Sequence, residues 1–170
     1  MNQRIVIIGS GFAGLWAALS AARAREIAGR APDALEIVVV SPEPTLVIRP
    51  RLYEAALDGM APDLRALFER VDVRHVAARV EHIDARTRTL RLAPAAVDTP
   101  DLLRYDRLVL AAGSVLHRPP VPGLALHAFD VDQLDSARRL DDHLQALARR
   151  PESAARNTVV TSMIGLGYYD

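Results

Sequence analysis

The sequence predicts an α/β fold in which a parallel sheet carries a small antiparallel β insertion. A β-branched run at residues 4–8 leads directly into a glycine-rich turn and a helical segment, as a buried parallel strand and its crossover helix do. A second apolar run spans residues 35–41. Apolar and polar residues alternate between 71 and 92, which indicates antiparallel strands. We therefore expect the insertion in that last stretch.

Glycine, proline and the spacing of apolar residues set the ends of the other elements. Gly29 and Pro32 end the first helix, prolines between 42 and 50 predict a loop, and Asp63 favours the start of a helical turn. Apolar residues spaced for one face predict an amphipathic helix at 131–149. The expected elements are a strand at 4–8, a helix at 11–29, a strand at 35–41, a short helix at 52–57, helical turns at 62–70, two or three antiparallel strands at 71–92, a connector at 94–101, a strand at 105–111, a helix at 131–149 and the start of a strand at 158–160.

The composition excludes several functional classes. The chain has 170 residues, enough for one domain with a core, and its 21 basic and 21 acidic residues cancel. No strong field favours nucleic acid or anionic lipid, so neither is expected as a partner. Because cysteine is absent, disulfides, thiolate catalysis and cysteine-ligated zinc are excluded. The five histidines lack metal-ligand spacing and are expected on the surface or in loops, and no bound metal is expected.

One uncharged stretch has a secretory alternative. Residues 5–22 carry no charge, and small residues lie at their end (Ala21, Ala22 and Ala24), as in a signal peptide. Gly9, Gly11 and Gly14 interrupt the apolar run at positions where a signal helix gains nothing from them. No other stretch is long enough to span a bilayer. We therefore expect a cytoplasmic chain that encodes no membrane association.

A glycine fingerprint follows the first expected strand. The segment Gly9-Ser10-Gly11-Phe12-Ala13-Gly14 matches G-x-G-x-x-G and opens the first expected helix. The first glycine permits the tight turn, the second lets the backbone approach a pyrophosphate, and the third lets helix and strand pack closely. The N–H groups and the positive dipole end of the helix stabilise phosphate charge. The segment predicts a dinucleotide site, the alternative being ordinary turn chemistry.

An acidic residue for the ribose is expected at the carboxyl end of the second strand, about 20 residues past the glycines. Glu36 is near in count but lies at the wrong end of that strand. Ser41 ends the strand and Glu43 follows two residues later. We expect Glu43 to bind the ribose hydroxyls with Ser41 as a neutral helper, the alternative being a solvated loop residue at 43.

Three segments in order carry a family resemblance. They are the glycine fingerprint, Ile48-Arg49-Pro50-Arg51-Leu52-Tyr53-Glu54, and Tyr105-Asp106-Arg107-Leu108-Val109-Leu110-Ala111-Ala112-Gly113-Ser114. Together they resemble the FAD-binding half of the pyridine nucleotide–disulfide oxidoreductase superfamily, in its type II NADH dehydrogenase-like branch, which lacks the active disulfide. The resemblance covers about residues 1–160 and implies a Rossmann-like FAD-binding domain.

The resemblance implies further contacts with FAD. In the family the third segment closes onto the flavin and pyrophosphate, which implies backbone contacts from Ala111–Gly113; the family's Ala-Thr-Gly is Ala-Ala-Gly here. The loop 49–54 is implied to lie near the isoalloxazine or ribityl chain, with Arg51 offsetting phosphate or reduced-flavin charge. By position, Val80 resembles the residue whose backbone recognises adenine. The alternative for Arg51 is a surface arginine without a ligand contact, and the alternative for Val80 is an ordinary strand residue.

The end of the chain is expected to depart from the family. Relatives continue into a second G-x-G-x-x-G that binds the nicotinamide cofactor, and residues 157–160 begin that pattern, but 165–167 supply only two glycines. Residues 162–170 resemble a segment of glycine decarboxylase, so we expect a frameshift or fusion, with a native divergent tail as the alternative. Residues 1–157 are thus expected to form an incomplete FAD-binding domain, and 158–170 the start of a truncated or aberrant second nucleotide-binding domain.

The resemblance implies a FAD-dependent NAD(P)H oxidoreductase. Hydride passes from the nicotinamide to the flavin, and electrons continue to a quinone or another acceptor. No catalytic acid or base is identified. The alternatives are an inert FAD- or nucleotide-binding remnant and an NAD(P)-binding dehydrogenase domain. As it stands, the chain is expected to hold FAD weakly, to leave NADH unoxidised, and to self-associate through the apolar surface of the missing domain. Full-length relatives are expected at the inner membrane face.

Overall fold

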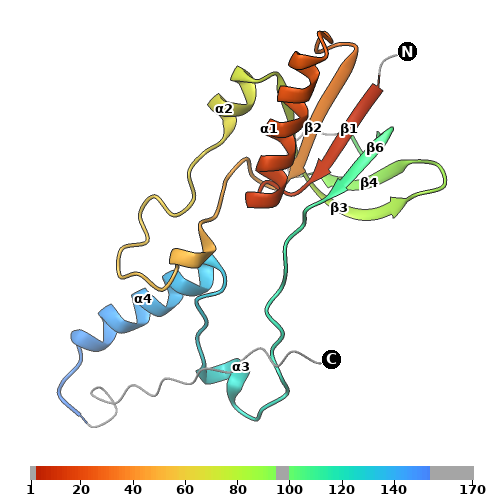
Figure 1. The fold of residues 1–170 in the computed structure, drawn as a ribbon. Coiled ribbons are helices and arrows are strands. Elements are labelled where there is room, and N and C mark those ends of the chain that lie inside the picture. The colour runs from red at the N-terminus through yellow and green to blue at the C-terminus, as the bar shows by residue number, and fades with distance from the viewer. Residues whose placement is uncertain (1–2, 95–99, 154–170) are drawn as a thin grey trace, which may run out of the picture.

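One six-stranded sheet organises the part of the chain that the computed structural model describes, residues 3–94 and 100–153 (Figure 1). The strand order is β5-β4-β3-β2-β1-β6. The strands are β1 (Gln3–Ile8), β2 (Leu35–Ser41), β3 (Val73–Asp84), β4 (Thr89–Pro94), β5 (Leu102–Arg104) and β6 (Arg107–Leu110). β6, β1, β2 and the start of β3 run parallel, whereas β3, β4 and β5 pair antiparallel further on. The predicted α/β class is confirmed.

Strand β3 belongs to both parts of the sheet. Its residues 73–77 pair in parallel with β2, and its residues 78–84 pair antiparallel with β4. The expectation of only antiparallel strands between 71 and 92 was therefore wrong for the first half of β3. Alternation of apolar and polar residues reports one buried face, and it does not report the direction of the neighbouring strand.

The helices differ from expectation mainly where they are short. They are α1 (Phe12–Ile27), a 3-10 turn (Arg49–Arg51), α2 (Arg65–Arg70), α3 (Leu124–His127) and α4 (Leu134–Ala148). The short helix expected at 52–57 is not formed, and the helical turn lies at 49–51, where Pro50 suits a first turn. β5 and α3 were not predicted, since three and four residues carry no periodicity. The strand expected at 158–160 lies outside the described residues.

Two apolar cores lie on opposite faces of the sheet. On one face Ile7, Ile37 and Val39 pack against α1 and α2, with Phe68 of α2 only 2% exposed. On the other face Val6, Ile8, Val38 and Val40 pack against the folded-over antiparallel strands through Leu90, Leu92 and Leu103. Strands β1 and β2 are thus covered on both faces, as their near-continuous apolar sequences require, whereas the edge strand β6 is largely exposed.

A single buried arginine ties the end of α1 to the sheet. Arg25 is 5% exposed, and its guanidinium donates to the carbonyls of Leu35, Val71 and Asp72 at 3.2, 2.8 and 3.1 Å. These carbonyls precede or begin β2 and β3. A buried charge is tolerated when its donors are satisfied, and here backbone dipoles satisfy them.

Helix α4 lies away from the sheet and packs on the loop around residues 47–60 (Figure 1). Leu52, Met60 and Ala137 are buried there, with Leu57 and Leu134 packed against them. This small third core connects the segment after β6 to the loop after β2.

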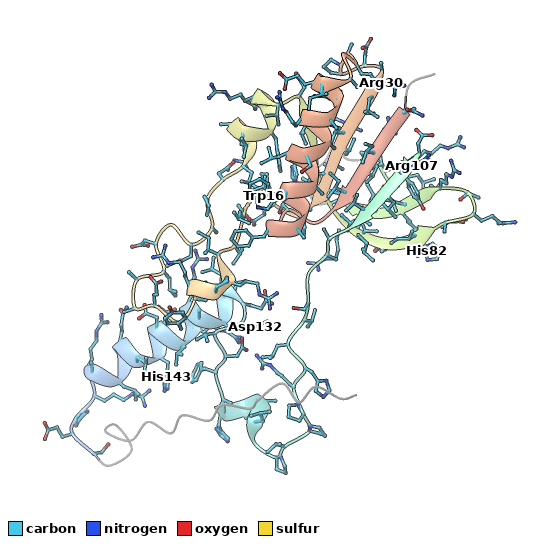
Figure 2. All side chains as sticks on the ribbon, in the orientation of Figure 1. Trp16, Arg30, His82, Arg107, Asp132 and His143 are labelled. Atoms are coloured by element: carbon cyan, nitrogen blue, oxygen red, sulfur yellow. The ribbon has the colours of Figure 1, made fainter. Side chains whose placement is uncertain are left out.

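An apolar strip stays exposed along α1. The apolar side chain of Trp16 on this helix predicts a place in the core, but it is 65% exposed; Phe12 is 46% exposed and Ile27 is 72% exposed, and Figure 2 shows Trp16 on the outer side of the helix. Leu110 at the end of the edge strand β6 is 68% exposed. Among residues 3–94 and 100–153, none of the helices is long and apolar enough to cross a membrane.

Candidate dinucleotide-binding site

The carboxyl ends of three parallel strands meet at one edge of the sheet. Ile8 of β1 is in register with Val40 of β2 and Leu110 of β6. The chain leaves these strands into the glycine fingerprint, the turn at 41–45 and the segment 111–114. Backbone bonds join them: Gly9 N–H donates to Val40 O at 2.8 Å and Ala111 N–H to Ile8 O at 2.9 Å. Three of the predicted segments thus come together at the edge where open α/β sheets bind ligands.

Two glycines of the fingerprint are required by the protein itself. Gly9 has φ +102°, and an added Cβ would lie 2.3 Å from the carbonyl oxygen of Ala111. At Gly14, inside α1, an added Cβ would lie 1.9 Å from the carbonyl oxygen of Gly9. The tight turn and the close helix–strand packing expected for these positions are therefore present.

Gly11 has no such requirement. Its φ is −64° and its ψ is −175°, which any residue adopts, and an added Cβ would meet no protein atom within 4 Å. It caps α1 without a side-chain hydrogen bond, and the first turn of this 16-residue helix has no acidic side chain. The first N–H groups of a helix have no acceptor within it. Open space before uncapped donors at the positive end of a helix fits a pyrophosphate group.

Ser10 fastens the neighbouring turn to the fingerprint, a role that the sequence did not indicate. Its side chain is 8% exposed, and the hydroxyl lies 2.8 Å from the carbonyl of Thr45 and 3.2 Å from that of Glu43. Ser10 is a variable position of the motif, so no signal in the pattern could have shown its partners more than 30 residues away.

The acidic residues near β2 separate into two roles. Glu36 forms ion pairs with Arg4 at 2.5 Å and with Arg74 at 2.7 Å, at the opposite end of the strand from the fingerprint. Glu43 is exposed beside the fingerprint, and within residues 3–94 and 100–153 its carboxylate has no hydrogen bond or ion pair. Of the two carboxylates, the one at the ligand edge is the one without a partner. Its contact with a ribose stays a prediction.

Ser41 is buried, and its hydroxyl serves the backbone. It is 5% exposed and donates to the carbonyl of Glu43 at 2.6 Å. The ring of His75 on β3 contacts the same hydroxyl at 2.9 Å. His75 was expected on the surface or in a loop, but it is half-buried within a strand, and burial lowers the pKa of its imidazole.

Arg49, not Arg51, contacts the segment after β6. The guanidinium of Arg49 donates to the carbonyl of Ser114 at 3.2 Å and to the backbone and carboxylate of Asp132, which lies just before α4 (Figure 2). Arg51 instead forms a two-bond ion pair with Glu54 at 2.7 and 2.8 Å. That bond raises the pKa of Arg51 and lowers the pKa of Glu54. Any contact of Arg51 with a ligand stays a prediction.

Two further predicted residues, Gly113 and Val80, lie after β6 and in β3, respectively. Gly113 has φ +76°, the left-handed region, so the turn after Ala111–Ala112 uses the freedom of glycine. Val80 lies in the antiparallel half of β3, opposite Leu92, next to a register shift between residues 80 and 82. Its side chain is partly buried against the core, and the adenine contact of its backbone stays a prediction. Among the described residues, no group of three or more His, Asp or Glu could hold a metal ion.

The chain belongs to the pyridine nucleotide-disulphide oxidoreductase family, whose sequence profile matches residues 3–166. The family is FAD-dependent and uses NAD(P)H as substrate. The predicted superfamily is confirmed.

Individual relatives agree with this membership. A NADH dehydrogenase-like protein of Mycobacterium tuberculosis is 45% identical over 163 residues, covering 96% of this chain and 40% of the relative. A demethylphylloquinone reductase of Synechocystis is 29% identical over 172 residues, covering 98% and 41%. The chain thus spans about two-fifths of the length of these relatives.

Solved structures share the fold. The sulfide:quinone oxidoreductase of Aquifex aeolicus matches with a TM-score of 0.69 at 22% identity, over 88% of this chain and 33% of the other. NDH2 of Plasmodium falciparum, solved with NADH, matches with a TM-score of 0.65 at 15% identity, over 87% and 30%. The predicted Rossmann-like architecture is the fold of these neighbours.

Proposed function

We propose that residues 1–157 form a FAD-binding domain and that the chain serves a FAD-dependent NAD(P)H oxidoreductase. The observation that carries the proposal is Gly11, a glycine with no role in packing, placed at the uncapped start of α1. Family membership supports FAD as the nucleotide. We propose residues 158–170 as the start of a truncated or aberrant second nucleotide-binding domain; they lie outside the described residues.

The chain's own residues bind and orient the cofactor. Backbone N–H groups from Gly11 to Gly14 would hold the pyrophosphate, Glu43 would accept from the ribose hydroxyls, and the backbone of Val80 would contact adenine. The backbone of Ala111–Gly113 and the side chain of Arg51 would lie toward the flavin end. When bound, FAD supplies the redox chemistry, accepting a hydride from a nicotinamide and passing electrons to a quinone or another acceptor.

A test of the nucleotide is direct. The purified protein is expected to bind added FAD saturably in equilibrium dialysis, and chromatography of the protein-bound fraction after heat or acid release should identify FAD. Release of NAD(P) without flavin would favour the alternative dehydrogenase domain. Absence of any bound nucleotide at saturating FAD would contradict the proposal. An inert FAD-binding remnant differs in a further step: it would hold FAD without saturable NADH oxidation above a control of free FAD.

Glu43→Gln is expected to weaken FAD binding about tenfold. The carboxylate is free in the described part of the chain, and replacing a charge-assisted hydrogen bond by a neutral one costs about 1–2 kcal/mol. Fluorescence titration of the apoprotein with FAD measures the change. The matched control is Glu81→Gln, an exposed carboxylate on β3 paired with Arg91 at 3.4 Å, which should leave affinity unchanged. Equal FAD affinities for the two variants would show that Glu43 is a solvated loop residue that does not contact FAD.

We further propose a cytoplasmic location and self-association through the exposed strip of α1 and the edge of β6. The strip joins Phe12, Trp16 and Ile27, and exposed apolar patches favour association.

A further inference from the structure

We propose that His75 is a positioning residue for the adenosine end of the FAD site, holding the turn that carries Glu43. The inference rests on the proposed function. It starts from a contact between neighbouring strands: the Nε2 atom of His75 on β3 lies 2.9 Å from the Ser41 hydroxyl and 3.1 Å from the Ser41 carbonyl on β2.

The neighbouring acceptors fix the tautomer of the ring. A carbonyl oxygen only accepts, so Nε2 must carry the proton that it shares with Ser41 O. The Ser41 hydroxyl already donates its hydrogen to the Glu43 carbonyl, at 2.6 Å, and is left as an acceptor toward the ring. The result is a directed chain of donors from His75 to Ser41 to the backbone of Glu43.

The ring itself is held in one place. It stacks on Phe68 of α2, with ring centroids 6.3 Å apart and planes 14° from parallel. Phe68 is fully buried, so the stack fixes the imidazole against the core that α1 and α2 form with the sheet. α2 and β3 thereby hold the end of β2 in place. Because Ser41 bonds to the carbonyl of Glu43, the turn at 41–43 is held in place as well. Ser10 braces the same carbonyl of Glu43 from the fingerprint side.

Burial of the ring disfavours its charged form. Burial lowers the pKa of His75, and the charged groups that act on the ring, Arg65 and Asp63, pair with each other at 2.7 Å. A His whose folded-state pKa is depressed contributes full stability above its ordinary pKa of about 6.5. That contribution is lost as pH falls through this value toward the lowered pKa. Burial thus favours the neutral ring, although both forms of the ring carry the Nε2–H that donates to Ser41.

The first arm of the test compares side chains with and without the donor. His75→Gln keeps an N–H near the Nε2 position, and His75→Leu and His75→Asn do not reach Ser41. FAD affinity should fall about five- to tenfold in the Leu and Asn variants and stay within about twofold of the parent in His75→Gln. His82→Leu, an exposed histidine on the same strand, is the control and should change nothing.

The second arm asks whether His75 acts through Glu43. In a Glu43→Gln background, His75→Leu and His75→Asn should each cost less than about twofold, because the group that they position is already impaired. Fully additive losses would overturn the proposal and leave His75 a residue of general stability. So would unchanged FAD affinity in both variants, or loss of affinity in the Gln variant equal to that in Leu and Asn.

The third arm tests the protonation of the ring through the pH dependence of stability. Between pH 7.5 and 5, the free energy of unfolding should decrease more in the parent than in His75→Gln, which cannot titrate. Equal pH dependence would overturn the account of the neutral ring. If the parent itself binds no FAD, the proposed function fails; if it binds FAD and the His75 variants match it, only this inference fails.

Discussion

Gly11→Val should weaken FAD affinity by a factor of about 100 or more. The free energy of unfolding should stay within about 1 kcal/mol of the parent. The backbone at Gly11 is extended and accepts a β-branched residue, and an added Cβ meets no protein atom within 4 Å. Its branches would instead occupy the space in front of the first N–H groups of α1, where the pyrophosphate is expected. FAD titration and urea denaturation measure the two quantities separately.

The control for this prediction is the third glycine of the same fingerprint. At Gly14 even a methyl group would lie 1.9 Å from the carbonyl oxygen of Gly9. Gly14→Ala should therefore destabilise the fold by about 3 kcal/mol or more, a cost typical of overpacking against a rigid backbone. Full FAD retention by Gly11→Val would show that the phosphates are bound elsewhere. Equal destabilisation by both variants would show that Gly11 also has a packing role.

Arg25→Met should cost about 3 kcal/mol of stability, the largest effect that we expect from a side chain outside the ligand site. Methionine fills a similar length but leaves three carbonyls, those of Leu35, Val71 and Asp72, without their shared donor. These carbonyls lie where α1, β2 and β3 meet. Loss of their hydrogen bonds with Arg25 therefore loosens two strands at once. Urea denaturation followed by far-UV circular dichroism measures the change.

Arg23→Met is the matched control for this change. Arg23 stands two residues earlier on α1 and pairs with Glu26 across a solvent-exposed turn, with side chains 67% and 71% exposed. Exposed pairs of this kind contribute at most about 1 kcal/mol, so this variant should remain close to the parent. Similar stabilities for the two variants would mean that water replaces the Arg25 donor at little cost.

The strand, glycine turn and helix at the start of the chain could be predicted because their information is local. Ile5–Ile8 is apolar on both faces, and the three fingerprint glycines are recognised by their short, fixed spacing, although the contact that requires Gly9 comes from Ala111, far along the chain. The same holds for the choice of Glu43 over Glu36, which follows from the direction of β2. The structure places the two carboxylates at opposite ends of that strand, as predicted.

The parts that sequence did not reveal depend on partners far along the chain. Ser10 is fastened to a carbonyl 35 residues away, His75 to a serine 34 residues away, and Arg49 to Asp132, 83 residues away. No periodicity encodes such contacts. Trp16 shows the opposite limit: its apolar character predicted burial, but a side chain's hydrophobicity does not say whether a neighbouring element is present to cover it.

The position of β1 between β2 and β6 has a consequence for synthesis of the chain. β1 is complete at residue 8 and its first neighbour at residue 41, but its second neighbour pairs across about a hundred residues, from Ile5 to Arg107. At about 5–20 residues per second, the ribosome delivers β6 roughly 5 to 20 seconds after β1. During that interval an apolar strand displays a bare hydrogen-bonding edge, which is a template for pairing with other nascent chains. Slower translation would lengthen this exposure, and a chaperone that binds extended apolar segments would shorten it.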